Sequence, residues 1–101
     1  MAQKIIVYWR DIPAQVIIKA GRKRATRQFS ERFEKAIDMA AMRSGMSGTD
    51  AYLEQWRRAA PEVIDGDDLD AIAERESASL EALYDHARLK ALIDNGGDEP
   101  G

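Results

Sequence analysis

Two short apolar runs, separated by a polar stretch, lie near the N-terminus. Both are rich in β-branched and aromatic residues, so they predict strands at residues 4–10 and 14–20. Pro13 lacks a backbone N–H and biases Ile12 away from helix, which favours a turn between the two strands. The pattern therefore predicts an antiparallel hairpin. The polar residues at its tip are Arg10, Asp11 and Gln15.

Farther along the chain, apolar residues recur every three or four positions, as they do on one face of a helix. The first predicted helix covers about residues 30–44, with Ser30 available as N-cap and Gly45 as C-cap. A second is predicted from about residue 50 to 60, where Pro61 stops it. The apolar face of this second helix carries Tyr52, Leu53 and Trp56. The Tyr52–Trp56 pair indicates core packing, with an exposed aromatic docking face as the alternative.

The last third of the chain predicts a short strand or extended connector at residues 62–65 and a helix at residues 69–94. Serines at positions 77 and 79 offer a point where this helix divides, so its continuity stays open. Its length suggests that it overhangs the domain and offers a surface for a homodimer. Residues 95–101, rich in Gly and acidic residues, read as a flexible tail.

These elements place the chain in the α+β class. We expect a single domain over residues 1–94, in which an antiparallel hairpin, with or without a third short strand, packs with about three helices. At 101 residues, with 45% hydrophobic composition, the chain can build one modest core.

Composition narrows the chemistry. The chain has no cysteine, which excludes disulfides, thiolate metal sites and cysteine nucleophiles. The first apolar run is too short for a signal peptide or a membrane helix, so we expect a cytoplasmic protein with no membrane contact. We expect neither a metal nor another cofactor, because His86 is the single histidine and no nucleophile–base arrangement is recognisable.

Charge is unevenly distributed. Residues 1–35 hold nine basic and three acidic residues, a net +6, whereas residues 36–101 hold six basic and fifteen acidic residues, a net −9. The run at residues 22–27 is expected to be a loop or the entry to a helix. It reads as a solvated charge run, as a contact for an acidic protein surface, or as a site for nucleic acid or another anion. The cations of that last reading are Lys19, Arg22, Lys23, Arg24 and Arg27.

Asp38 lies in the middle of the first predicted helix, beside its apolar stripe. It reads as an ion-pair partner, as an exposed carboxylate or as part of a site. An enzyme that works through carboxylates alone would need Asp11 and Asp38 to converge in one pocket. Arg10 and Asp11 also have a structural reading, in which they lock the turn by pairing with Asp38 or with backbone groups. The residue pattern favours a protein that is not an enzyme, without excluding one.

Several segments together carry a family pattern: residues 9–16, 31–33, 36–42 and 51–53, with Trp56. In these residues the chain resembles the bacterial virulence factor domain, in its small stand-alone form. A related domain occurs within the larger conserved virulence factor C proteins. The resemblance covers residues 4–60 and brings no catalytic residues with it.

The resemblance implies an accessory role in cofactor or one-carbon metabolism, alongside corrinoid and folate methyltransferases. The leading prediction is therefore a cytoplasmic, non-enzymatic accessory protein that binds a protein partner, with methyltransferase-pathway proteins as candidates. The residues predicted to meet the partner are Arg10, Asp11, Gln15 and Asp38. The alternative is nucleic-acid or anionic-ligand binding through the basic segment at residues 19–27.

Overall fold

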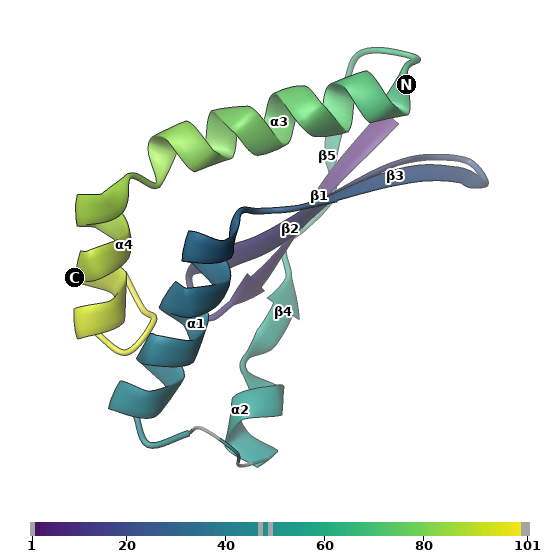
Figure 1. Cartoon of the computed structure of the whole chain (residues 1–101). Coiled ribbons are helices and arrows are strands. Elements are labelled where there is room, and N and C mark those ends of the chain that lie inside the picture. Colours follow the sequence, from purple (N-terminus) through teal and green to yellow (C-terminus); the bar gives the residue numbers. More distant parts are fainter. Residues whose placement is uncertain (1, 47, 49, 100–101) are drawn as a thin grey trace.

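The computed structural model describes residues 2–46, 48 and 50–99. The strands are β1 (Ala2–Trp9), β2 (Ile12–Ala20), β3 (Lys23–Gln28), β4 (Trp56–Arg58) and β5 (Glu62–Ile64). The helices are α1 (Glu31–Arg43), α2 (Asp50–Glu54), α3 (Leu69–Leu83) and α4 (His86–Asp94) (Figure 1). The predicted α+β class is confirmed, and this part of the chain holds more strands and helices than we expected.

The predicted hairpin forms the centre of one antiparallel sheet in the order β3-β2-β1-β4, with β5 also paired to β1. The register changes from Val7 opposite Gln15 to Tyr8 opposite Pro13, which leaves Ala14 as an extra residue in β2. Pairing with β3 begins only at Gln15, so the missing N–H of Pro13 interrupts no ladder on that side. Pro13 is thus accommodated within β2, whereas the sequence pattern had indicated a turn at this position.

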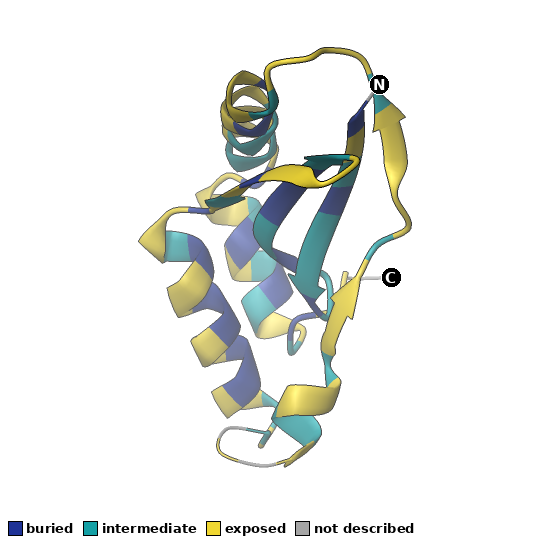
Figure 2. Ribbon diagram, turned by 90° about the vertical axis from the view of Figure 1, so that its right-hand side faces the viewer, coloured by how far each residue is buried: buried dark blue, intermediate teal, exposed yellow. Residues whose placement is uncertain are grey.

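The core forms where α1, α3 and α4 pack against each other and against the sheet. Buried residues line the inner side of α1 and recur along β1 and β2, whereas β4 and most of β5 are exposed (Figure 2). α3 lies across β2 and β3, and α4 lies against α1. The largest side chains in this core are Trp9, Phe33, Ile12, Ile18 and Leu92.

The expectation of a loop or helix entry at residues 22–27 was wrong. This basic segment forms most of β3, the edge strand that pairs with β2 from Gln15–Gln28 to Ala20–Lys23. The backbone N–H and C=O groups on the free edge of β2 require partners. The segment pairs with them and forms a strand, although its own sequence gives only a weak strand pattern. Ala25 is its one buried residue, and cations are common on edge strands because they discourage further pairing.

The second predicted helix was also wrong in its extent. α2 ends at Glu54, and the chain then turns into β4, which pairs with β1. β5, predicted as a strand or connector, pairs with the other half of β1. Both short strands satisfy the edge of β1 that β2 leaves open, so pairing with β1 decides the structure of residues 56–64.

Residues 69–94 form two helices, and the break lies at Tyr84 and Asp85 and not at the serines. The Ser77 hydroxyl donates to the Glu74 carbonyl inside an unbroken α3. Asp85 accepts a hydrogen bond from the Arg88 N–H at 2.8 Å and thereby caps α4. The homodimer predicted for these helices stays a prediction. None of the helices in the described residues is long and apolar enough to cross a membrane.

A half-buried ion pair links α3 to the sheet. The Lys4 Nζ donates to the Glu76 Oε1 at 2.9 Å and lies 3.3 Å from the Glu62 Oε2, and the Lys4 and Glu76 side chains are each 17% exposed. Burial alone would raise the pKa of Glu76, but the hydrogen bonds and charges of Lys4 and, to a lesser extent, Arg75 together outweigh burial and lower this pKa from its usual 4.5. A carboxyl with a lowered pKa stabilises the fold above its ordinary pKa, and this contribution is lost as the pH falls through the folded value.

We therefore predict that Glu76→Gln lowers the free energy of unfolding at neutral pH by about 1–2 kcal/mol. The acid limb of the stability profile, below about pH 4.5, should also become shallower. Urea unfolding between about pH 3 and about pH 7 measures both effects. The control is Glu74→Gln on the exposed side of α3, and equal acid limbs for the two variants would contradict the prediction.

Candidate functional site

The turn of the central hairpin consists of Arg10 and Asp11. Arg10 has a φ of 53°, and it is the one non-glycine residue with a positive φ in the described parts of the chain. The left-handed conformation costs an L-residue about 1–2 kcal/mol. Arg10 therefore needs interactions elsewhere that offset this cost.

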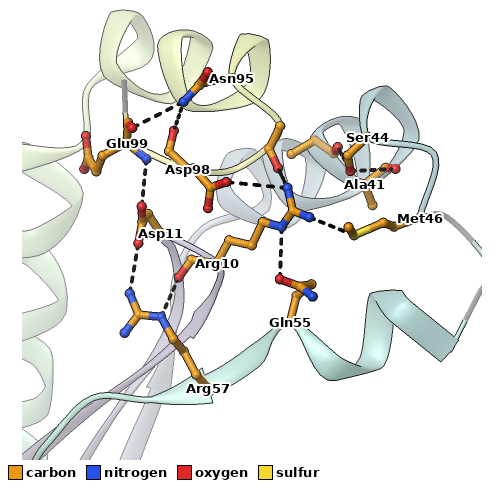
Figure 3. A network of polar contacts seen from close by, with 12 residues as sticks. Arg10, Asp11, Ala41, Ser44, Met46, Gln55, Arg57, Asn95, Asp98 and Glu99 are labelled. Atoms are coloured by element: carbon orange, nitrogen blue, oxygen red, sulfur yellow. Dashed lines mark hydrogen bonds and ion pairs between the residues drawn. The ribbon is translucent and has the colours of Figure 1, made fainter. Parts of the chain in front are cut away.

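The Arg10 guanidinium makes interactions that offset the strain of the turn (Figure 3). The Arg10 Nε donates to the Gln55 Oε1 at 3.1 Å, Nη1 donates to the Gly96 carbonyl at 2.8 Å, and Nη2 contacts the Met46 Sδ at 3.0 Å. Nη1 also lies 3.7 Å from the Asp98 Oδ2. With its side chain 15% exposed, Arg10 connects the turn to the loop after α1, the start of β4 and the segment after α4.

Asp11 is held from two sides. Its Oδ1 lies 3.0 Å from the Arg57 Nη2, and its Oδ2 accepts a hydrogen bond from the Glu99 N–H at 2.7 Å (Figure 3). The Asp11 N–H donates to the Gly97 carbonyl at 2.9 Å. These contacts match the structural reading of Arg10 and Asp11, although the carboxylate beside Arg10 is Asp98 and not Asp38. Partner recognition by the two residues stays a prediction.

The segment after α4 lies directly on this turn. Gly97 is buried with a φ of 101°, and a Cβ there would lie 2.7 Å from the Trp9 ring, so the packing requires glycine. The tail flexibility predicted for residues 95–101 stays a prediction, and residues 100–101 lie outside the described residues. The contacts show that residues 96–99 form part of the turn's surroundings.

A cleft of about 260 Å³ opens on the surface of the domain. It lies between α1 on one side and α2 with β4 on the other, and the ends of β2 and β3 close it. Its aromatic surface includes Trp56, which is 37% exposed although it is a large apolar residue. The residues that line the cleft are Ala14, Gln28, Phe29, Glu34, Ile37, Asp38, Tyr52 and Trp56.

The negative charges of Glu34 and Asp38 affect the pKa of the Tyr52 hydroxyl. Burial raises the pKa of Tyr52 from its usual 10.0, and the charges of Asp38 and Glu34 raise it further. The phenol therefore stays neutral at physiological pH. Within the described chain, neither carboxylate forms a hydrogen bond or an ion pair through its side chain, and the same holds for the Gln28 amide.

The four residues predicted to contact a partner lie in two different places. Asp38 lines the cleft, and Gln15 lines an adjoining hollow with Val7, Ala14, Gln28 and Trp56. Arg10 and Asp11 belong instead to the turn network. Asp11 does not line the cleft, so the two carboxylates of the enzyme hypothesis have different surroundings.

Sequence reasoning did not single out Gln28 or Glu34 of the cleft. The signal for the carboxylates was present, because Glu34 and Asp38 are four positions apart on a predicted helix and so share a face. Tyr52 and Trp56 were interpreted as core packing of one helix, with an exposed aromatic docking face as the alternative. Their contact, with ring centroids 6.2 Å apart, instead joins α2 to β4.

The cations of residues 19–27 lie near the end of β2, in the turn after it and on the edge strand β3. Arg27 is 3.5 Å from Asp70, but Lys19, Arg22, Lys23 and Arg24 have no ion pair with any described residue. Asp67, Asp68 and Asp70 line the same surface hollow as Lys23 and Arg24. The acidic half of the chain therefore lies beside part of the basic segment and pairs directly with one of its cations.

No group of His, Asp and Glu side chains in the described residues is arranged to hold a metal ion. Comparison with known families gives one match: the family model described as virulence factor matches residues 7–93. This match runs on through α3 and α4, beyond the residues 4–60 that carry the resemblance noted above. No curated protein and no solved structure matches the chain.

The turn network generates a stability prediction. Arg10→Lys keeps the charge and the backbone strain but cannot reproduce the forked hydrogen bonds, so we expect a loss of about 1–3 kcal/mol in the free energy of unfolding. Urea unfolding measures the loss. The control, Arg24→Lys on the exposed edge, should change stability by less than about 0.5 kcal/mol. Wild-type stability of Arg10→Lys would show that the network does not hold the turn.

Proposed function

The chain belongs to the virulence factor family, and from this premise we propose that it is a cytoplasmic, non-enzymatic protein-interaction domain. Its partner docks in the cleft between α1 and β4. The family name describes an effect of the protein and not a mechanism, so the proposal depends on the cleft itself.

The observation that carries the proposal is the combination of surfaces in the cleft. Trp56 is partly exposed next to the Tyr52 ring, and three polar side chains around them have no partner in the described chain. Aromatic residues dominate the energetics of protein interfaces, and polar groups around them fix the orientation of a partner. A domain that needed these residues only for its own stability would bury the ring and pair the polar groups.

The resemblance to the family adds a direction for the search. It supports a role beside corrinoid and folate methyltransferases, in one-carbon or cofactor metabolism. Methyltransferase-pathway proteins are therefore the first candidates for the partner. Gln15 and Asp38 contact the partner in this proposal, whereas Arg10 and Asp11 hold the turn that positions β4.

We predict that the tagged protein captures one partner stoichiometrically from its native host, in the presence of nuclease. Trp56→Ala should reduce recovery about tenfold or more, because truncation of a central aromatic residue typically removes a large share of binding energy. Quantitative mass spectrometry of the captured proteins provides the measurement.

The control variant is Leu83→Ala, which truncates an exposed apolar residue at the end of α3, away from the residues that line the cleft. It should retain the partner. Equal recovery with both variants, or no stoichiometric protein with the wild type, would reject docking in the cleft.

A second candidate function is binding of nucleic acid or another anion along β3. The observation that favours it is the set of four cations, Lys19, Arg22, Lys23 and Arg24, that have no ion pair in the described structure. The nearby carboxylates of Asp67, Asp68 and Asp70 oppose it. Such binding would release counterions and would depend steeply on salt.

If this second function holds, the affinity for a single-stranded oligonucleotide falls with salt at a log–log slope of about −3 to −4. The triple variant Arg22→Gln/Lys23→Gln/Arg24→Gln should reduce that slope by about 2. Fluorescence anisotropy at several salt concentrations gives the slopes, with Lys90→Gln on α4 as control. A slope that the triple variant leaves unchanged would exclude β3 as the binding surface.

A further inference from the structure

We infer that the cleft between α1 and β4 binds an arginine side chain from a segment of the partner protein. This inference rests on the proposed function and names the chemical group that the cleft recognises. The argument uses the charge of the cleft, the arrangement of its rings and its size.

The charge of the cleft is negative and uncompensated. Glu34 and Asp38 are the charged residues that line it, and both are exposed on neighbouring turns of α1. The two cations nearest to them in sequence are engaged elsewhere: Lys35 lies 3.6 Å from Glu31, and Arg32 binds the Glu81 and Tyr84 carbonyls. The cleft therefore offers two free carboxylates to a positively charged group.

The facing wall is aromatic. The Tyr52 and Trp56 rings stand nearly perpendicular, at 89°, and Phe29 also lines the cleft. The face of an aromatic ring attracts a cation, and a guanidinium can stack on such a ring while its N–H groups bind carboxylates in a fork. Both halves of this recognition are present across one cleft.

Arginine fits this arrangement better than the other cations. A metal ion would need a larger set of oxygen ligands than two exposed carboxylates, and the rings would contribute nothing to it. An ammonium group is a compact, strongly hydrated point charge that cannot bridge two carboxylates with a planar fork. The planar guanidinium uses the rings and both carboxylates at once.

The shape of the site suits a side chain carried by an extended segment. A cleft of about 260 Å³ has room for one such side chain. It continues into the hollow beside Gln15 and Gln28, whose amide groups can hydrogen-bond a peptide backbone. The inserted arginine would therefore belong to an extended peptide segment that runs along this hollow.

The experiment is an NMR titration of the full chain with N-acetyl-arginine amide, followed at the Trp56 indole N–H. N-acetyl-citrulline amide, which has the same shape without the charge, and N-acetyl-lysine amide are titrated in parallel. We expect a saturable shift with the arginine compound, none with citrulline and weaker binding with lysine. Glu34→Gln and Asp38→Asn should each weaken arginine binding about fivefold.

Glu74→Gln on α3 makes the same change of charge at an exposed position outside the cleft and should bind like the wild type. Equal binding of citrulline, equal affinity for lysine or no saturable shift with arginine overturns the inference. The proposed function has a separate test. A captured partner that is lost with Trp56→Ala but retained with Glu34→Gln and Asp38→Asn would overturn arginine recognition while docking in the cleft stands.

Discussion

The fold depends on the side chain of Arg10. This residue occupies a strained left-handed position in the turn of the central hairpin, and its guanidinium contacts Gln55, Met46 and the segment after α4. A forked cation can bind several acceptors in fixed directions, which no other side chain does as well. The same Arg10 side chain therefore offsets the strain of the turn and holds the surrounding segments against it.

The same interaction decides where the candidate site lies. The Arg10 N–H donates to the Gln55 carbonyl, and the Arg57 Nε donates to the Arg10 carbonyl, so the turn holds both flanks of Trp56. The Trp56 ring reaches the cleft because β4 is fastened at these two points. Gln55 and Arg57 thus hold the turn, whereas Trp56 between them faces the cleft.

Local signals in the sequence were sufficient for the hairpin and for α1. Both have strong periodicity and clear boundaries, such as Gly45, whose φ of 73° suits a helix end. Residues 23–28 and 56–58 lack a strong signal of their own, and they form strands because β2 and β1 had open edges. Asp38, which lines the cleft, and Gln15, which lines the adjoining hollow, were among the predicted partner contacts, and that role stays a prediction. Trp56 was predicted on a helix and lies in β4.

The sequence by itself determined the α+β class, the central hairpin, α1 and the separation of basic and acidic halves, because these follow from spacing and composition within short windows. Only the tertiary structure decided the order of the strands, the break at Tyr84 and Asp85, and the separation of Arg10 and Asp11 from Asp38. Contacts between segments more than thirty positions apart contribute to this arrangement, such as Arg32 with Tyr84 and Arg10 with Gly96. Periodicity within one element carries no information about which distant backbone group will need a partner.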